Sequence, residues 1–294
     1  MTGEFTAVES RIDAWAHRVL DGAPEHGWRA RFVELAVFVL KQAWACVFGA
    51  AFLAVLVATK LWYPDDALVA RNDFLVLAAI TIQVLMLVFR LETLREAGVI
   101  VIFHAVGTVM EIFKTSVGSW VYDGEGLLHL GGVPLYSGFM YAAIGSYMVR
   151  VYRLFDLRFD RYPRRWITVV LAGAIYANFF LHHYLWDVRL ALFVASALVF
   201  GFCTMQARIF RARIQLPILV SFLLVATFIW FAENIGTWAD AWRYPNQEDG
   251  WEVVSLAKLG SWYLLMIISV VLVTFLYPPR APDEPRDPVL VGKV

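Results

Sequence analysis

Two stretches of this sequence share one pattern of residues. Residues 111–122 read EIFKTSVGSWVY and residues 233–244 read ENIGTWADAWRY, and both fit E-x3-T-x4-W-x-Y. Six pairs of identical residues share the offset 233 − 111 = 122: Glu111/Glu233, Thr115/Thr237, Trp120/Trp242, Tyr122/Tyr244, Gly138/Gly260 and Tyr141/Tyr263. Repetition at a fixed offset indicates an internal repeat, with parallel halves at about 33–155 and 156–277.

The composition indicates a membrane protein. Of the 294 residues, 60% are hydrophobic and 17% are charged, whereas soluble domains carry roughly 25% charged residues. Lys and Arg together number 25, as do Asp and Glu, so there is no basic excess and we expect no nucleic-acid partner. Cys46 and Cys203 show no ligand-like spacing and are expected to be small core residues.

Eight apolar segments are long enough to cross a bilayer as helices, which takes about 20 residues. They lie at about 33–58, 73–90, 97–117, 133–152, 166–185, 188–206, 216–236 and 256–277. The predicted fold class is therefore all-α, a polytopic bundle of eight transmembrane helices arranged as a 4+4 repeat.

The two ends of the chain differ from this apolar region. Residues 1–32 are predicted to be a cytoplasmic segment with an amphipathic helix, because Ile12, Trp15 and Val19 recur at helical spacing. The tail, 278–294, is rich in proline and charge and is predicted to be disordered.

The basic residues predict how the chain is oriented. Most of the 25 Lys and Arg residues lie in the N-terminal segment, in the connections after the second, fourth and sixth predicted spans, and in the tail. Basic residues concentrate on the cytoplasmic side of membrane proteins, so both termini are predicted to be cytoplasmic. We expect a multi-pass protein of the bacterial inner membrane, with the lipid bilayer as its partner.

Glu111 and Glu233 are the candidate catalytic residues. An ionisable side chain is costly in hydrocarbon and therefore faces the interior of a helix bundle, where two carboxyl groups in unequal surroundings can act as general acid and general base. The side chains expected to bind substrate beside them are Trp120, Tyr122, Trp242, Tyr244, His104, His182, Lys114 and Asn234. Aromatic rings in such a set would stabilise a carbocation.

Other interpretations of these residues remain open. Glu111 would pair with Lys114 at i+3 and serve structure alone, while the second acid would bond to neighbouring Asn, Tyr or Trp donors. Lys114 has Gly236 as its counterpart, so the two acids would be unequal. His182 or His183 would join the two carboxylates in a metal site, but no metal site is predicted and no attachment motif identifies a cofactor.

Three long stretches resemble the YoaT-like family of bacterial integral membrane proteins. They are HAVGTVMEIFKTSVGSWVYDGEGLLHLGGVPLYSGFMYAAIGSYMVR at 104–150, FIWFAENIGTWADAW at 228–242 and SLAKLGSWYLLMIIS at 255–269. The resemblance covers about 35–277. It implies a membrane location and a domain of unknown function.

A shorter stretch resembles the membrane carotenoid enzymes, the lycopene-cyclase-like and carotenoid-hydratase-like families. Glu111 is followed by Gly118, Trp120 and Tyr122, and then by GVPL at 132–135. In those families acids protonate a polyene double bond inside the bilayer, and the resemblance implies this role for Glu111. The second half lacks the GVPL opening, and the double-acid motifs of the cyclases are absent from the sequence.

The leading hypothesis for function is binding or acid–base conversion of a lipophilic, isoprenoid-like molecule between the two halves, near the outer leaflet. One alternative is a proton-coupled transporter, in which the acids are relay groups. Another is a structural or assembly subunit. A transporter would need polar residues that continue to the cytoplasmic side, where few, such as Gln42 and Gln83, are found. Motifs of soluble enzymes such as GxSxG and HExxH are absent from the sequence.

Overall fold

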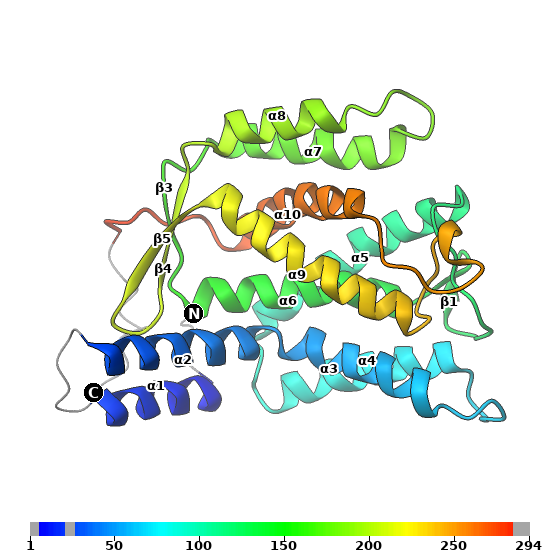
Figure 1. The fold of residues 1–294 in the computed structure, drawn as a ribbon, viewed down its shortest axis with the longest axis horizontal. Helices are drawn as coiled ribbons and strands as arrows, with labels where there is room; N and C mark the ends of the chain where they lie inside the picture. The colour runs from blue at the N-terminus through cyan, green and yellow to red at the C-terminus, as the bar shows by residue number, and fades with distance from the viewer. Residues whose placement is uncertain (1–5, 21–26, 285–294) are drawn as a thin grey trace.

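The computed structural model describes residues 6–20 and 27–284, which form ten α-helices and two small β-sheets (Figure 1). The helices are α1 (Ala7–Leu20), α2 (Trp28–Ala45), α3 (Val47–Trp62), α4 (Arg71–Val88), α5 (Leu94–Ser116), α6 (Tyr136–Leu154), α7 (Arg165–Leu181), α8 (Arg189–Phe200), α9 (Ile218–Trp238) and α10 (Leu256–Leu276). The sheets lie at opposite ends of the bundle (Figure 1).

Four of the described helices are long and apolar enough to cross a membrane: α4, α5, α9 and α10. The pair α2–α3 makes a fifth candidate if it is one broken span, since the two helices are bent by 64°. The apolar helices α7 and α8 are shorter, with 17 and 12 residues. The protein is therefore mostly helical with four or five candidate membrane-spanning helices, and the eight predicted crossings are not confirmed.

The predicted span 33–58 is wrong as a single helix, because α2 ends at Ala45 and α3 begins at Val47. The break lies where the guanidinium of Arg150, on α6, donates a hydrogen bond to the carbonyl oxygen of Trp44 at 3.1 Å. A side chain that bonds to a helix carbonyl can interrupt the backbone ladder and bend the helix. The bend thus accompanies a buried arginine whose partner the sequence does not reveal.

The predicted span 188–206 is wrong in its last six residues, because α8 ends at Phe200. After α8 the chain forms β4 (Thr204–Arg208), which lies between β3 (Arg158–Asp160) and β5 (Arg213–Pro217) in an antiparallel sheet. Along β5 exposed and half-buried residues alternate, which is the period of a strand rather than a helix. A second, two-stranded sheet joins β1 (His129–Leu130) to β2 (Val133–Pro134).

The N-terminal helix α1 packs against α2. Its residues Ile12, Trp15 and Val19 are half-buried against the core, as expected for the apolar stripe of an amphipathic helix. The predicted helix therefore exists, and its apolar side rests on the protein.

The first part of the tail runs beside β3. The N–H of Phe159 donates to the carbonyl of Arg280 at 2.8 Å, and Arg158 donates to the carbonyls of Ala281 and Pro282. The rest of the tail predicted to be disordered, residues 285–294, lies outside the described residues.

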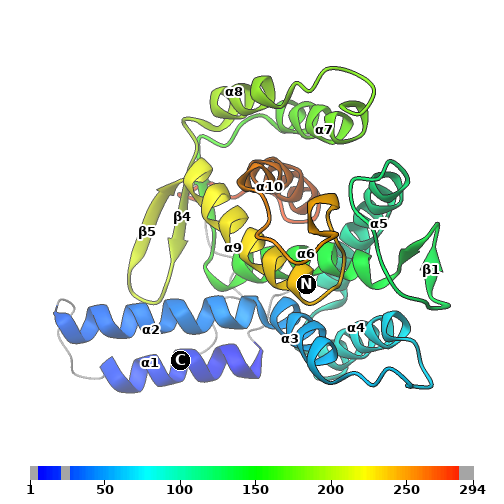
Figure 2. The same cartoon turned by 45° about the vertical axis from the view of Figure 1, so that its right-hand side comes forward.

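The central helix α6 packs against α5 along most of its length and also contacts α2, α3, α4 and α10 (Figure 2). Glycines allow the close approach of α5 and α6. A Cβ added to Gly138 would lie 2.5 Å from both the His104 ring and the Thr108 hydroxyl, and one added to Gly107 would lie 2.4 Å from Tyr141. No side chain fits at either glycine without movement of its neighbours.

We expect Gly138→Ala to destabilise the fold by about 1–3 kcal/mol, the usual cost of overpacking. The matched control is Gly173→Ala, because Gly173 is also helical and has nothing within 4 Å of an added Cβ. There alanine should stabilise the helix by roughly 0.5–1 kcal/mol. Thermal unfolding of the detergent-solubilised variants measures both changes, and a Gly138→Ala protein as stable as the Gly173→Ala protein would refute this packing.

Candidate functional site

The carboxyl group of Glu111, near the end of α5, is buried and accepts three hydrogen bonds. Trp120 Nε1 and the Tyr122 hydroxyl donate to Oε2 at 2.7 and 2.6 Å, and the Tyr141 hydroxyl donates to Oε1 at 2.7 Å. Two donors come from the loop that follows α5 and the third comes from α6. The carboxyl group is thus enclosed by neutral donors.

The carboxyl group of Glu233, near the end of α9, has a closely similar environment. The Tyr244 hydroxyl donates to Oε1 at 2.5 Å and Trp262 Nε1 donates to Oε2 at 2.7 Å. Tyr244 follows α9 and Trp262 lies on α10. Each carboxyl site is therefore built by a helix, the loop after it and the next helix.

The tyrosines of the two loops remain hydrogen-bond donors at neutral pH. Burial, and then the nearby carboxylate of Glu111, raises the pKa of Tyr122 well above its usual value. Burial and the carboxylate of Glu233 do the same to the pKa of Tyr244. Both phenols thus keep their protons, and their O–H groups stay directed at the acids.

The two carboxyl sites are neighbours at one end of the bundle, which we call the acid end. The rings of Trp120 and Tyr244, one from each site, meet edge to face with their centroids 6.0 Å apart. Lys258 lies against both rings, its Nζ 4.1 Å from the Tyr244 centroid and 5.0 Å from that of Trp120. One ammonium group therefore stands between the two acids.

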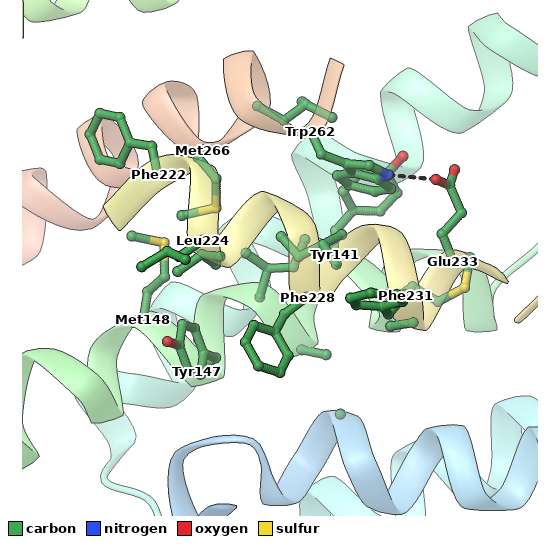
Figure 3. Close-up of a pocket in the computed structure, with 18 of the residues that line it drawn as sticks. Tyr141, Tyr147, Met148, Phe222, Leu224, Phe228, Phe231, Glu233, Trp262 and Met266 are labelled. Atoms are coloured by element: carbon green, nitrogen blue, oxygen red, sulfur yellow. Dashed lines mark hydrogen bonds between the residues drawn. The ribbon is translucent and has the colours of Figure 1, made fainter. Parts of the chain in front are cut away.

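A cavity of about 1240 Å³ begins at the acid end and extends through the bundle. Figure 3 shows Glu233 and Trp262 at one end of it, with Phe222 and Met148 at the other. Apolar side chains from α2, α3, α6, α9 and α10 form most of its wall. The cavity is thus a long apolar space with its acids at one end.

The cavity also reaches the outside of the bundle along α9. Leu224, Phe228 and Phe231 line it and are at the same time 52%, 75% and 54% exposed. Val39, on α2, likewise lines it and is exposed. A lateral opening beside α9 therefore connects the cavity with the apolar surroundings of the helices.

Lys114 does not pair with Glu111. Its Nζ lies 3.0 Å from Nε2 of His183 and faces the Phe179 ring at 5.9 Å, so the expected i+3 ion pair is wrong. Lys114 and His182 both line the cavity, and the His182 Nδ1 lies 2.8 Å from the carbonyl oxygen of Asn178.

Two residues predicted to bind substrate lie away from the cavity wall. His104 packs edge to face on Phe139 at 4.7 Å and rests against Gly138. Asn234 donates to the Trp230 carbonyl and accepts from the Val254 N–H at 2.9 Å, which ties α9 to the loop before α10. Neither is among the lining residues. Both hold helices together, and their role in substrate binding stays a prediction.

The remaining predicted residues, Glu111, Glu233, Trp120, Tyr122, Trp242 and Tyr244, all line the cavity. Trp242 differs from its counterpart Trp120, which donates to Glu111, because no hydrogen bond joins Trp242 to Glu233 among the described contacts. Its ring lies over Gly236, where an added Cβ would come within 2.6 Å of it.

Sequence reasoning missed two donors and the place of Lys258. Tyr141 follows Glu111 by 30 residues and Trp262 follows Glu233 by 29. The fixed offset of 122 pairs Tyr141 with Tyr263 instead, which packs against Phe193. A search for any buried donor one helix after each acid would have found Trp262.

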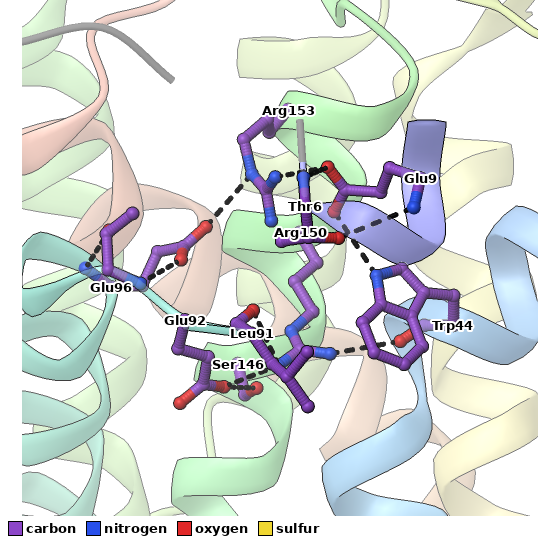
Figure 4. A network of polar contacts seen from close by, with 10 residues as sticks. Thr6, Glu9, Trp44, Leu91, Glu92, Glu96, Ser146, Arg150 and Arg153 are labelled. Atoms are coloured by element: carbon purple, nitrogen blue, oxygen red, sulfur yellow. Dashed lines mark hydrogen bonds and ion pairs between the residues drawn. The ribbon is translucent and has the colours of Figure 1, made fainter. Parts of the chain in front are cut away.

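A second buried polar cluster lies at the opposite end of α6 (Figure 4). Arg150 is fully buried and pairs with Glu92 at 3.0 Å, and Ser146 donates to the same carboxylate at 2.6 Å. Arg153 joins Glu9 of α1 to Glu96 of α5. This cluster connects four helices, lies away from the two carboxyl sites, and has the features of a structural network.

No group of three or more His, Cys, Asp or Glu side chains suited to a metal ion occurs among residues 6–20 and 27–284. His183 bonds to Lys114, and the two acids bond to tryptophans and tyrosines. The acid end therefore offers hydrogen-bonded carboxyl groups and an ammonium group for chemistry.

These features define a class: a helical protein of membrane type in which two buried carboxyl groups close one end of an apolar cavity. The chain belongs to the family described as "Protein of unknown function (DUF817)", which matches residues 34–270. It is 40% identical over 243 residues to the "Uncharacterized protein YoaT" of Bacillus subtilis (strain 168), which covers 83% of this chain and 91% of that protein. No solved structure matches it. The predicted YoaT-like membership is confirmed.

Tyr141→Phe removes one donor to Glu111 and changes little else, since the ring is kept. A hydrogen bond to a charged group contributes about 1.5–3 kcal/mol, and we expect a loss of stability of this size. The control is Tyr147→Phe on the same helix, which loses a 3.3 Å bond to the neutral amide of Gln42 and should cost about 0.5–1.5 kcal/mol or less. Reversible unfolding in mixed micelles compares the two, and equal losses would contradict a charge-assisted bond at Glu111.

Proposed function

We propose that this protein binds a lipophilic molecule within the bilayer and converts it by acid–base chemistry. The supporting observation is an apolar cavity of about 1240 Å³ with Glu111 and Glu233 at one end. Ligand pockets usually measure about 300–1,000 Å³, so this cavity has room for a long hydrocarbon chain. The opening beside α9 suits a molecule that arrives sideways from the membrane.

The proposed reaction moves a double bond. Protonated Glu233 adds its proton to a carbon–carbon double bond, and the carbocation loses a neighbouring proton to the carboxylate of Glu111. The proton then returns from Glu111 to Glu233, which restores both acids for the next turnover. The substrate is isomerised, and no oxidant or second reactant is needed. Glu111 suits the role of base, because three donors stabilise its carboxylate form against two at Glu233. The rings of Trp120 and Tyr244 lie beside both acids and would stabilise the cation.

Isoprenoids are the substrate class that this reaction favours. Their double bonds are branched, so protonation gives a tertiary carbocation, and their chains are apolar enough to enter the cavity. The local resemblance of residues 111–135 to membrane carotenoid enzymes points in the same direction. The acids and aromatic rings lie at one end, which suits chemistry at one end of a chain.

We also propose that α3–α6 and α7–α10 are two copies of a four-helix unit. Adding 122 to the first residues of α3, α4, α5 and α6 gives 169, 193, 216 and 258, close to the starts of α7, α8, α9 and α10 at 165, 189, 218 and 256. Val121 and Arg243, themselves 122 apart, form an antiparallel bridge with N–H···O distances of 3.0 and 2.9 Å. A residue paired with its own counterpart lies on a local two-fold axis, as two parallel copies require.

The proposed setting is the bacterial inner membrane, with all eight of these helices embedded and both termini in the cytoplasm. Highly exposed tryptophans support it: Trp28 begins α2, Trp62 ends α3 and Trp186 follows α7. Tryptophan is enriched where helices meet the membrane surface. The uneven distribution of Lys and Arg supports the orientation, with the acid end toward the outer leaflet.

The rival hypotheses fit this geometry less well. A proton-coupled transporter needs polar groups along its whole path, but the wall of the cavity far from the acids has few, such as Gln42 and Ser221, among apolar residues such as Phe155, Leu157 and Met205. A structural subunit needs no cavity of this size. A one-sided site for a lipophilic molecule accounts for both the cavity and the clustered acids.

We expect Ala232→Trp to reduce the lipid retained by the purified protein several-fold, because Ala232 lines the cavity and a large ring would fill part of it. Val220→Trp is the control, since Val220 is 42% exposed on the same helix and is not a lining residue. Mass spectrometry of lipid extracts from both variants gives the comparison. Equal retention would count against a lipophilic ligand in this cavity.

Glu233→Gln and Glu111→Gln should each abolish the conversion, because an amide neither gives nor takes the required proton. The chain is expressed in an isoprenoid-producing host and the extracted isoprenoids are profiled, with Glu125→Gln in an exposed loop as control. A new isomer should appear with the wild type and the control only. Profiles that do not differ among the variants would reject the reaction, and proton uptake by vesicles that depends on both acids would favour a transporter.

A further inference from the structure

We infer that the ligand of this cavity is an amphiphile with an anionic headgroup, such as a phosphate or carboxylate, held at the acid end by Lys114, Lys258 and Arg189. The inference rests on the proposed function, since it assumes that a lipophilic molecule occupies the cavity, and it specifies the class of that molecule.

The cationic side chains of the cavity wall all gather at the acid end. They are Lys114 from the end of α5, Arg189 from the start of α8 and Lys258 from the start of α10. The charges of Lys258, Arg189 and Asp187 all act on Lys114, so the three cations and this carboxylate lie within electrostatic reach of one another. Three cations from three helices converge on one region.

Two of these cations have no carboxylate partner. Among the described residues no ion pair within 4.0 Å includes Lys114 or Lys258, whereas Arg189 pairs with Asp187 at 2.8 Å. Lys258 Nζ lies over the rings of Trp120 and Tyr244. An ammonium group has three N–H donors, and one removed from water without an acceptor is costly. Both groups therefore have donors to offer to a ligand.

The nearby acids do not satisfy the donors of the two lysines, and Asp187 pairs with Arg189. The oxygens of Glu111 and Glu233 accept their hydrogen bonds from tryptophans and tyrosines. His183, at the end of α7, bonds to Lys114, and burial followed by the Lys114 charge lowers the pKa of this histidine. A neutral imidazole contributes no charge, so the positive charge of Lys114 remains available to an anion.

The N-terminus of α10 adds to this positive region. Its N-cap, Ser255, lines the cavity together with Ala257 and Lys258. The Ala257 and Lys258 N–H groups donate to Ser255, but the dipole at the start of a 21-residue helix still favours a negative group. Helix dipole and lysines thus act in the same direction.

The apolar lining away from the acid end indicates that the anionic headgroup is attached to a hydrocarbon chain. Beyond the acid end the lining includes Met148, Leu224 and Phe228, a surface for hydrocarbon and not for a hydrophilic solute. A free anion would leave this space unused, and an uncharged lipid would leave the lysines unpaired. A charged head on an apolar chain satisfies both parts of the cavity.

The test measures binding of dodecyl phosphate, dodecanoate, dodecanol and inorganic phosphate to the full chain in phosphatidylcholine nanodiscs. We expect both anionic amphiphiles to bind at least tenfold more tightly than dodecanol or inorganic phosphate, and the order of the two to identify the headgroup. Lys258→Gln and Lys114→Gln should each weaken the preferred anion about tenfold and leave dodecanol unchanged. Lys258→Arg should retain binding, and Lys60→Gln, at an exposed lysine paired with Asp240, should have no effect.

Different failures have different meanings. If dodecanol binds as tightly as the anions and the lysine variants change nothing, the headgroup inference is overturned while a lipophilic ligand stands. If inorganic phosphate binds as tightly as dodecyl phosphate, the ligand is a free anion and the inference of an amphiphile is overturned. If no amphiphile binds, the proposed function fails as well. Should a lysine variant not fold, the wild type still decides, because the preference for dodecyl phosphate over dodecanol is measured on the wild type alone.

Discussion

A polar group inside an apolar bundle must find its partners within the protein, and this constraint organises the structure. The central helix α6 supplies partners for buried polar groups at both of its ends. Near its start Tyr141 donates to Glu111, and near its end Arg150 pairs with Glu92 and donates to Trp44. The contact with Trp44 coincides with the bend between α2 and α3. The site and the shape of the bundle therefore follow from the same requirement, because the partners that satisfy each buried group come from different helices.

The two carboxyl sites are built with different side chains. Trp120 donates to Glu111. Its counterpart Trp242 lies over Gly236 instead, and the tryptophan that donates to Glu233 is Trp262. Gly236 is the residue that corresponds to Lys114, and only a residue without a side chain leaves room for the ring there. A lysine in one half and a tryptophan ring in the other thus occupy matching positions. This difference makes the two carboxyl groups unequal, which a divided role as acid and base requires.

The sequence predicts the polar residues of this protein better than its helix ends. Glu111, Trp120 and Tyr122 could be found because their spacing is repeated, and spacing survives when the surrounding apolar residues change. The end of α8 could not be predicted, because apolar residues continue to Cys203. Only pairing with β3 and β5 makes 204–208 a strand. The placement of Lys258 could not either, since a lysine near a helix end usually extends to the surface, and its contacts come from rings distant in sequence.

The size of the cavity connects the fold to the membrane. Protein interiors are packed at the density of organic crystals, and a cavity costs free energy in proportion to its volume. In the proposed setting, hydrocarbon from the bilayer would fill this space of about 1240 Å³. The side chains that both line the cavity and reach the outside, Leu224, Phe228 and Phe231, would form the entry for such a chain. Since the acids lie at one end only, a chain that fills the space would bring one of its ends to Glu111 and Glu233, so under the proposed function the burial that stabilises the fold would also position the ligand.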